Sequence, residues 1–380
     1  MRSKDLGSDN AARNDAFVWT RHAVSKVTIA AIGSFLVVWW WLAVVLQFQF
    51  MRSDIAGYWR DSLAWRTPFN PDHVPGYPLL IAALRFLTAE QFEPVGLFWS
   101  VTFCTHIAGA LAVYSSVTSR TDQQIGFLSA ILFILWPFVG TTYVVYPIAD
   151  SIALALIAWG VPLLLSKRFH AAAILLGLAT VIHKGTWPFV ILFLLAGIIT
   201  HHRRFPWTTL LIAACPLGLL CVAGMIENGY GPSWLVSESL PIQFATKSSL
   251  PVLDGLVGTI LKGGMKSLAK SVILWAHVAV LVTLCVALFR WRDSAMKWLG
   301  LAIVGGLLFL YSGLNQNIIW AAVRYSKIAA LPLGFYLGTQ PRVAAALAQN
   351  RWIIVSLVVV LLASQFAFCW YMVDDFFAPK

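Results

Sequence analysis

Charged residues are scarce in this chain. Asp, Glu, Lys and Arg make up 11% of its 380 residues, and hydrophobic residues make up 59%. An average soluble protein has about 25% charged residues. A soluble chain of this length cannot bury nearly every helix on all sides. The composition therefore argues against a soluble protein and predicts helices that cross a membrane repeatedly.

Paired cysteines, metal-ligand motifs and phosphate-binding loops are also absent. The five cysteines all lie inside apolar segments, so we interpret them as small core residues. The eight histidines are scattered without a His-Glu-x-x-His pattern, and no Gly-rich Walker or Rossmann loop follows a strand. No cofactor follows from these patterns, although a divalent metal that bridges carboxylates and a phosphate needs no such motif.

Long apolar runs dominate the chain, and several reach the roughly 20 residues that a transmembrane helix needs. We expect an all-α, polytopic membrane protein with about eleven transmembrane helices, a short amphipathic helix in the first outer loop and no large soluble domain. Residues 27–380 form the single transmembrane module. The expected spans are 27–50, 93–117, 124–139, 148–165, 170–183, 186–200, 207–225, 270–290, 297–314, 318–338 and 352–374.

Basic residues set the expected orientation. The N-terminal tail, residues 1–26, is rich in Lys and Arg, has no small-residue cleavage site and is expected to be cytoplasmic. Most other basic residues fall in short segments between apolar runs, which is typical of cytoplasmic loops facing anionic lipid. The net charge of +11 is thereby explained without a nucleic-acid partner. We expect a bacterial inner (plasma) membrane protein with two long outer loops, 51–92 and 226–269.

One apolar stretch tests this topology. The segments "SKRFH" (166–170) and "HHRRFP" (201–206) are both basic, and about 30 residues separate them. Both are cytoplasmic only if the stretch between them crosses twice. The polar break at His183, Lys184 and Gly185 predicts two short helices that turn near the outer face. The alternative is a single span, which would place every later segment on the opposite side of the membrane.

The first outer loop concentrates charge. Ser53 is a suitable N-cap for a short amphipathic helix that ends at Pro68. Ile55, Trp59 and Leu63 share a face expected to meet the lipid interface, and a second face, expected to meet the protein, contains the following residues: Asp54, Tyr58, Asp61 and Trp65. The alternatives are that Asp54 complements the helix dipole, that Arg60 and Asp61 are solvated, and that the segment of Asp72 and His73 is a proline-rich turn.

Further polar residues lie at the outer ends of later spans. Asp150 follows Tyr146 and Pro147 at the start of the fourth span, His183 and Lys184 lie at the outer turn, and Arg324 and Tyr325 lie in the tenth span. Ionisable groups in spans tend to mark functional cavities. The alternatives are helix-start capping for Asp150 and snorkelling for Arg324. A carboxylate at this rim can accept a proton from a hydroxyl, and cations can hold a departing phosphate. No soluble nucleotide-sugar site is apparent, so the expected donor is a lipid phosphate.

The order of these features resembles the GT-C superfamily of integral-membrane glycosyltransferases, in particular polyprenyl-phosphate-sugar-dependent, mannosyltransferase-like members. The resemblance covers most of the chain and is carried by the early outer Asp followed by "PGYPLLIAAL", and by "YPIADSIALALIAWG", "LATVIHKGTWPFVILFLLAG" and "VRYSKIAALPLG". It implies Asp54 as catalytic base and Lys184, Arg324 and His183 as donor-phosphate ligands, with Tyr325 beside them. Substrate contacts are expected from Tyr58, Arg60, Asp72, His73, Tyr146 and Asp150.

Asp54 departs from the family pattern, because many members carry two adjacent acidic residues where this chain has Asp54 and Ile55. Many members also have a large soluble domain after the last span. The acceptor is therefore expected to be a lipid-linked glycan, a glycolipid or a small surface polymer.

The leading hypothesis is an inverting hexosyl- or pentosyltransferase with a polyprenyl-phosphate-sugar donor and an outward-facing site. A polysaccharide polymerase or ligase is an alternative, but loop 226–269 has none of the Arg and His residues typical of those enzymes. A transporter or lipid flippase would need ionisable groups near the middle of the bilayer. A structural subunit with a degenerate site would look much the same in sequence.

Overall fold

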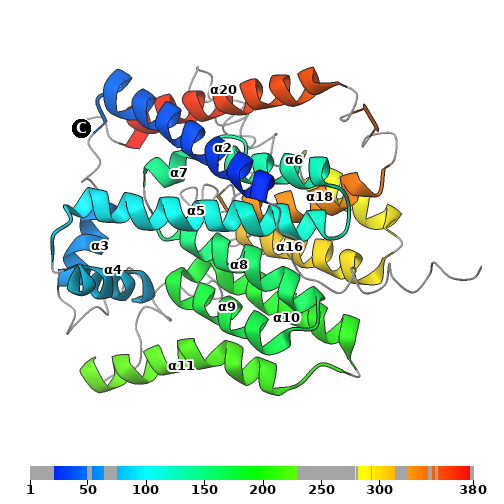
Figure 1. The fold of residues 1–380 in the computed structure, drawn as a ribbon. Coiled ribbons are helices and arrows are strands. Elements are labelled where there is room, and N and C mark those ends of the chain that lie inside the picture. The colour runs from blue at the N-terminus through cyan, green and yellow to red at the C-terminus, as the bar shows by residue number, and fades with distance from the viewer. Residues whose placement is uncertain are drawn as a thin grey trace, which may run out of the picture.

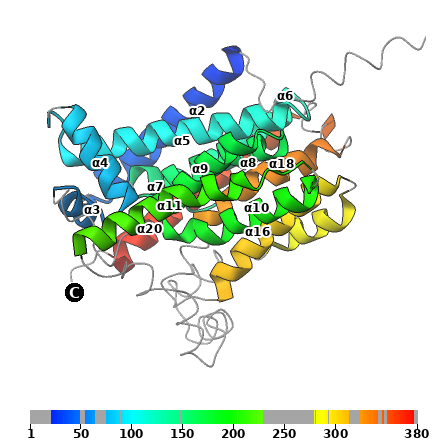
Figure 2. The same cartoon turned by 90° about the horizontal axis from the view of Figure 1, so that it is seen from below.

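The computed structural model describes most of the helical part of the chain. The described residues are 21–48, 54–63, 75–88, 90–146, 148–202, 204–228, 279, 281–291, 293–312, 324–340, 345–346 and 350–376. Every regular element within these ranges is a helix, as Figures 1 and 2 show. The expected all-α class is therefore confirmed. The outer loop 226–269 beyond Asn228 and the N-terminal tail before Arg21 lie outside the described residues.

Among the described residues, three helices are long and apolar enough to cross a membrane. They are α2 (Arg21–Trp40), which continues as the π-helix η1 (Trp41–Val45), α5 (Pro94–Thr118) and α20 (Arg351–Phe376). The 25 residues of α5 correspond to about 37 Å at 1.5 Å per residue, which exceeds the roughly 30 Å hydrocarbon core of a bilayer. The chain is thus a membrane protein, as its composition predicts.

The remaining helices are shorter, and most of them are apolar. In chain order they are α3 (Asp54–Leu63), α4 (Gly76–Leu87), α6 (Gln123–Ile134), α7 (Thr142–Val145), α8 (Asp150–Leu165), α9 (Phe169–Ile182), the 3₁₀ turn η2 (Lys184–Thr186), α10 (Trp187–His201), α11 (Thr208–Asn228), α16 (Ser294–Ser312), the 3₁₀ turn η3 (Ser326–Ala329) and α18 (Ala330–Gly338).

The bundle is built around α8, which packs against both α5 and α9. In Figure 1, α2 and α20 lie at one edge of the molecule and α11 at the opposite edge, with α11 packed on α9 and α10 packed on α16. Most side chains of α8 are buried, as expected for a helix that is apolar all round and enclosed by neighbours. Its first residue, Asp150, is consequently buried as well, with 2% of its surface exposed.

Helices α3 and α4 pack together at one end of the bundle, on the left in Figure 1. A Cβ atom on Gly76 would lie 2.1 Å from the carbonyl oxygen of Val181, so α4 approaches the end of α9 at backbone distance. The indole Nε1 of Trp99 donates to the carbonyl of Val145 at 2.6 Å, which fastens the start of α5 beside the start of α8. We call this the α3–α4 end, and the other the opposite end.

An irregular segment between α6 and α7 is held by α20. The buried Gln365 accepts hydrogen bonds from the backbone N–H and the hydroxyl of Thr142, at 3.2 and 2.8 Å, and donates to the carbonyl of Trp136 at 2.6 Å. These bonds serve polar groups that no helix satisfies, which is the requirement for irregular backbone at membrane depth.

The predicted helix boundaries differ from the structure in two places. The expected span 124–139 is wrong at its end, because α6 ends at Ile134 and the chain turns around Pro137, whose ring removes a backbone donor. In the first loop, one short helix that ends at Pro68 is expected, whereas the structure also has α4 from Gly76 to Leu87 with Pro75 as N-cap. The predicted pair of short helices broken at residues 183–185 is confirmed as α9, η2 and α10.

Candidate functional site

A buried ion pair lies at the centre of the α3–α4 end. Nη1 of Arg324 donates to Oδ2 of Asp150 at 3.0 Å, and Nε2 of His183 lies 3.7 Å from Oδ1 of the same carboxylate. The Asp150 side chain is 3% exposed, whereas those of Arg324 and His183 are 19% and 18% exposed. A buried carboxylate is costly unless it is paired and hydrogen-bonded. The structure therefore brings together three predicted site residues from segments far apart in sequence.

The tautomer of His183 follows from its neighbours. Its Nδ1 accepts a hydrogen bond from the backbone N–H of Gly185 at 3.1 Å, so Nδ1 carries no proton. In the neutral ring the proton then sits on Nε2, directed at the Asp150 carboxylate. His183 can thus neutralise part of the carboxylate's field without being charged.

The hydroxyl of Tyr325 faces two acceptors. It contacts Nδ1 of His183 and interacts electrostatically with the Asp150 carboxylate. The hydroxyl has one proton to donate, so it serves these acceptors alternately. The ring of Tyr325 stacks on Phe189 at 5.7 Å between centroids, and a Cβ atom on Gly185 would lie 2.7 Å from it. Glycine at position 185 is therefore required by close approach.

A series of aromatic residues links this cluster to α3. Tyr58 packs edge-to-face on Tyr77 at 4.8 Å between centroids, and the Tyr77 phenol interacts electrostatically with Asp150. The guanidinium of Arg324 lies 5.2 Å from the centroid of Tyr143. Tyr77 and Tyr143 were not among the predicted site residues. These aromatic contacts place α3, which begins at Asp54, beside the ion pair.

The two faces of α3 agree only partly with prediction. Tyr58 and Asp61 are buried, at 7% and 6% exposed, so the second face does pack against the protein. The expectation that Ile55 faces lipid is wrong, because this side chain is fully buried. Solvation of Asp61 is likewise wrong, whereas the Arg60 side chain is 73% exposed and lies 3.6 Å from the carboxylate of Asp61.

The other predicted site residues have different outcomes. Tyr146 is buried and packs on Phe48 at 5.8 Å between centroids. Asp72 and His73 lie outside the described residues, as do the side chains of Asp54 and Lys184, whose backbones start α3 and η2.

Lys327 and His106 form a second buried polar pair that the sequence interpretation missed. Nζ of Lys327 lies 2.8 Å from Nδ1 of His106 and 4.3 Å from the centroid of Phe133. His106 is the thirteenth residue of the 25-residue α5, near the middle of that span. The available signal was a lysine three residues after Arg324 and a histidine inside an apolar run, because ionisable groups in spans are rare.

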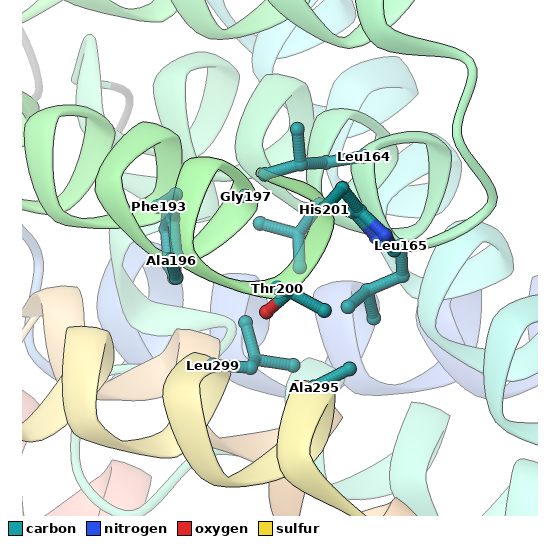
Figure 3. A pocket seen from close by; sticks show the side chains of 10 residues that line it. Leu164, Leu165, Phe193, Ala196, Gly197, Thr200, His201, Ala295 and Leu299 are labelled. Atoms are coloured by element: carbon teal, nitrogen blue, oxygen red, sulfur yellow. The ribbon is translucent and has the colours of Figure 1, made fainter. Parts of the chain in front are cut away.

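One small cavity lies away from this site. Figure 3 shows it between α10, the end of α8 and the start of α16, with Leu164, Phe193 and Leu299 among its walls. Its volume is about 10 Å³, which is room for at most one water molecule. We interpret this cavity as a packing gap.

The cluster offers an anion-neutralising surface and exchangeable protons. Arg324 and the Nε2–H of His183 present cationic and donor groups, and the Tyr325 hydroxyl can pass a proton between a carboxylate and an imidazole. Within the described ranges, no group of three or more His, Cys, Asp or Glu side chains is placed to hold a metal ion. The chain matches no known family model and no curated protein.

Proposed function

We propose that this protein is an inverting glycosyltransferase with about eleven transmembrane helices, and that it uses a polyprenyl-phosphate sugar as donor. The observation that carries the proposal is the Asp150–Arg324 ion pair with His183 and Tyr325, located at the end of the bundle where α3 begins with Asp54. In the proposed orientation this end faces outward from a bacterial inner membrane. The acceptor is a lipid-linked or cell-surface glycan or a glycolipid.

In this mechanism an acceptor hydroxyl attacks the anomeric carbon of the donor. The carbon–oxygen bond to the phosphate breaks, and polyprenyl phosphate leaves with the bonding electrons. Asp54 takes the hydroxyl proton as general base. Arg324, His183 and Lys184 neutralise the charge on the departing phosphate. Asp150 positions Arg324 through their 3.0 Å hydrogen bond.

The support for this assignment is geometric. The carboxylate of Asp150 already has partners, so it is poorly suited to be the base. Asp54 lies one helical turn before the buried Tyr58, which contacts Tyr77 beside the cluster. A base on α3 and two cations, Lys184 in η2 and Arg324 just before η3, would then flank one donor headgroup from two sides.

The experiment is transfer of a radiolabelled sugar from polyprenyl-phosphate donors by membranes containing the wild type, Asp54→Asn or Asp122→Asn. We expect loss of a general base to reduce transfer by about 10²-fold or more. Asp122 is the matched control, because it caps α6 at the opposite end through Gln124 and Ile125, and asparagine keeps a capping oxygen. Equal expression and equal thermal stability are checked first.

Two results would count against the proposal. If Asp54→Asn transfers sugar as fast as the wild type, Asp54 is only a helix-start residue and Asp150 becomes the candidate base. If the wild type transfers no sugar from a panel of donors, the glycosyltransferase assignment fails.

The Lys327–His106 pair favours a second candidate, a proton-coupled transporter or lipid flippase. The pair lies near the middle of α5, and coupling groups of transporters are found at such a depth. Lys327→Met would then abolish substrate flux driven by a proton gradient in proteoliposomes. A glycosyltransferase would show no such flux in the wild type.

A further inference from the structure

A cavity lies at the opposite end of the bundle from the ion pair. Its volume is about 430 Å³, which is within the range of small-molecule sites. Three connecting segments form it: the turn after α5, the segment before α16 and the end of α18. Nothing in the proposed transfer reaction uses this cavity.

Two arginines line the cavity. Arg120 is partly buried, and its guanidinium lies 5.2 Å from the centroid of Phe335. Its hydrogen bond to the hydroxyl of Ser116 is long, at 3.5 Å. Burial lowers the pKa of Arg120 from its ordinary value, and the Asp293 carboxylate opposes that effect. An arginine keeps its charge even so. Arg290 is exposed at the rim.

Trp291 also lines the cavity, and it has a buried donor. Trp291 is 4% exposed, and its indole Nε1 is buried without a hydrogen-bond acceptor among the described residues. Leaving such a donor unpaired costs roughly 1–3 kcal/mol. Asp293 is the acidic residue of the wall, and its Oδ1 accepts from the backbone N–H groups of Ala295 at 2.8 Å and Met296 at 3.4 Å. The two arginines outnumber this single carboxylate, so the cavity has an excess of positive charge and favours an anion.

We propose that this cavity binds a phosphate group, as a lipid headgroup or as a soluble phosphate. Arginine pairs with phosphate through parallel N–H donors, and basic pockets between membrane helices bind anionic headgroups. Thr339 and Gln340 add polar side chains to the wall. The site is separate from the proposed transfer site, so it does not depend on the glycosyltransferase proposal.

The test measures retention of phosphatidylglycerol against phosphatidylcholine by the purified full chain in native mass spectrometry. The cavity variant is Arg120→Gln with Arg290→Gln. The control variant is Arg168→Gln with Arg204→Gln, which removes the same charge from exposed positions outside the cavity. We expect the cavity variant to bind phosphatidylglycerol about tenfold or more weakly, and the control to bind like the wild type.

A second arm uses inorganic phosphate and thermal unfolding. If phosphate stabilises the wild type and the control but not the cavity variant, the ligand is a soluble phosphate. The single variant Arg290→Gln is measured as well, because Arg290 is exposed at the rim and its replacement should not disturb folding. If the cavity and control variants lose lipid affinity equally, or if neither ligand binds the wild type, the proposal is overturned.

Discussion

At the scale of single residues, the Asp150 carboxylate depends on its partners. Arg324, His183 and Tyr325 all contact it in a place where 3% of the side chain is exposed. Removing one partner of such a pair leaves an uncompensated buried charge, which is strongly destabilising. Removing both partners together costs less than the sum of the two single removals, and this difference is measurable.

We expect Asp150→Asn and Arg324→Gln each to lower the free energy of unfolding by about 3 kcal/mol, and the double variant to lose less than the sum. The measurement is unfolding in mixed micelles, analysed as a double-mutant cycle. Additive losses would contradict the ion pair. Asp122→Asn, at an exposed cap, is expected to change the free energy of unfolding by less than about 0.5 kcal/mol.

Tyr325→Phe separates the hydroxyl from the ring. The ring contacts with Phe189 and Gly185 remain, so stability should change by about 1 kcal/mol. Transfer should fall about tenfold, because the hydroxyl contacts His183, one of the proposed phosphate ligands, and helps to hold it in place. Tyr336→Phe at the opposite end is the control. Transfer unchanged in Tyr325→Phe would show that its hydroxyl only fills space.

The sequence predicted part of this site. Asp150, His183, Arg324 and Tyr325 stood out because polar residues are expensive in apolar spans. Their partners did not, since Tyr77 and Tyr143 are ordinary aromatic residues in sequence and gain meaning only from tertiary contact. Lys327 carried the same signal as Arg324 and was overlooked. Its partner His106 lies 221 residues away along the chain, and no local pattern connects them.

At the scale of elements, polar breaks and prolines decided where prediction succeeded. The break at residues 183–185 was readable because three polar or flexible residues interrupt two apolar runs. The end of α6 was missed although Pro137 lies just after it, because the other residues of 135–139 are as apolar as the helix before them. What stabilises that turn is Gln365, a residue of α20 that satisfies its backbone.

Gln365→Leu should therefore destabilise the fold. It leaves the buried backbone N–H of Thr142 without its side-chain acceptor, and it removes one partner each from the Thr142 hydroxyl and the Trp136 carbonyl. We expect a loss of at least about 2 kcal/mol and a lower midpoint of thermal unfolding in detergent. Gln124→Leu, at an exposed position of α6, is the control and should unfold near the wild-type temperature. Equal midpoints for the two variants would contradict the role of Gln365.

At the scale of the whole molecule, the bundle has two ends that differ in their charged residues. The α3–α4 end holds the ion pair, and the opposite end holds basic turns such as Lys167–Arg168 and the arginine-lined cavity. Composition alone predicted the membrane class and the helical fold. Lateral packing depends on which buried faces fit one another, and that information is not local in the sequence.

Orientation is testable with single cysteines. After the five native cysteines are replaced by serine, a membrane-impermeant maleimide should label Glu90→Cys in intact cells and Arg168→Cys only after permeabilisation. Both positions are exposed, at the α3–α4 end and the opposite end respectively. Labelling of both from the same side would contradict the proposed topology.

The central claim is that sugar leaves a polyprenyl phosphate at the α3–α4 end. The measurement uses purified, reconstituted wild type and a donor labelled in both sugar and lipid, and it quantifies the transferred sugar and the released lipid phosphate. We predict one polyprenyl phosphate released for each sugar transferred, and a product whose anomeric configuration is opposite to that of the donor. Intact donor that crosses the bilayer without release of the lipid phosphate would contradict the account and favour a flippase.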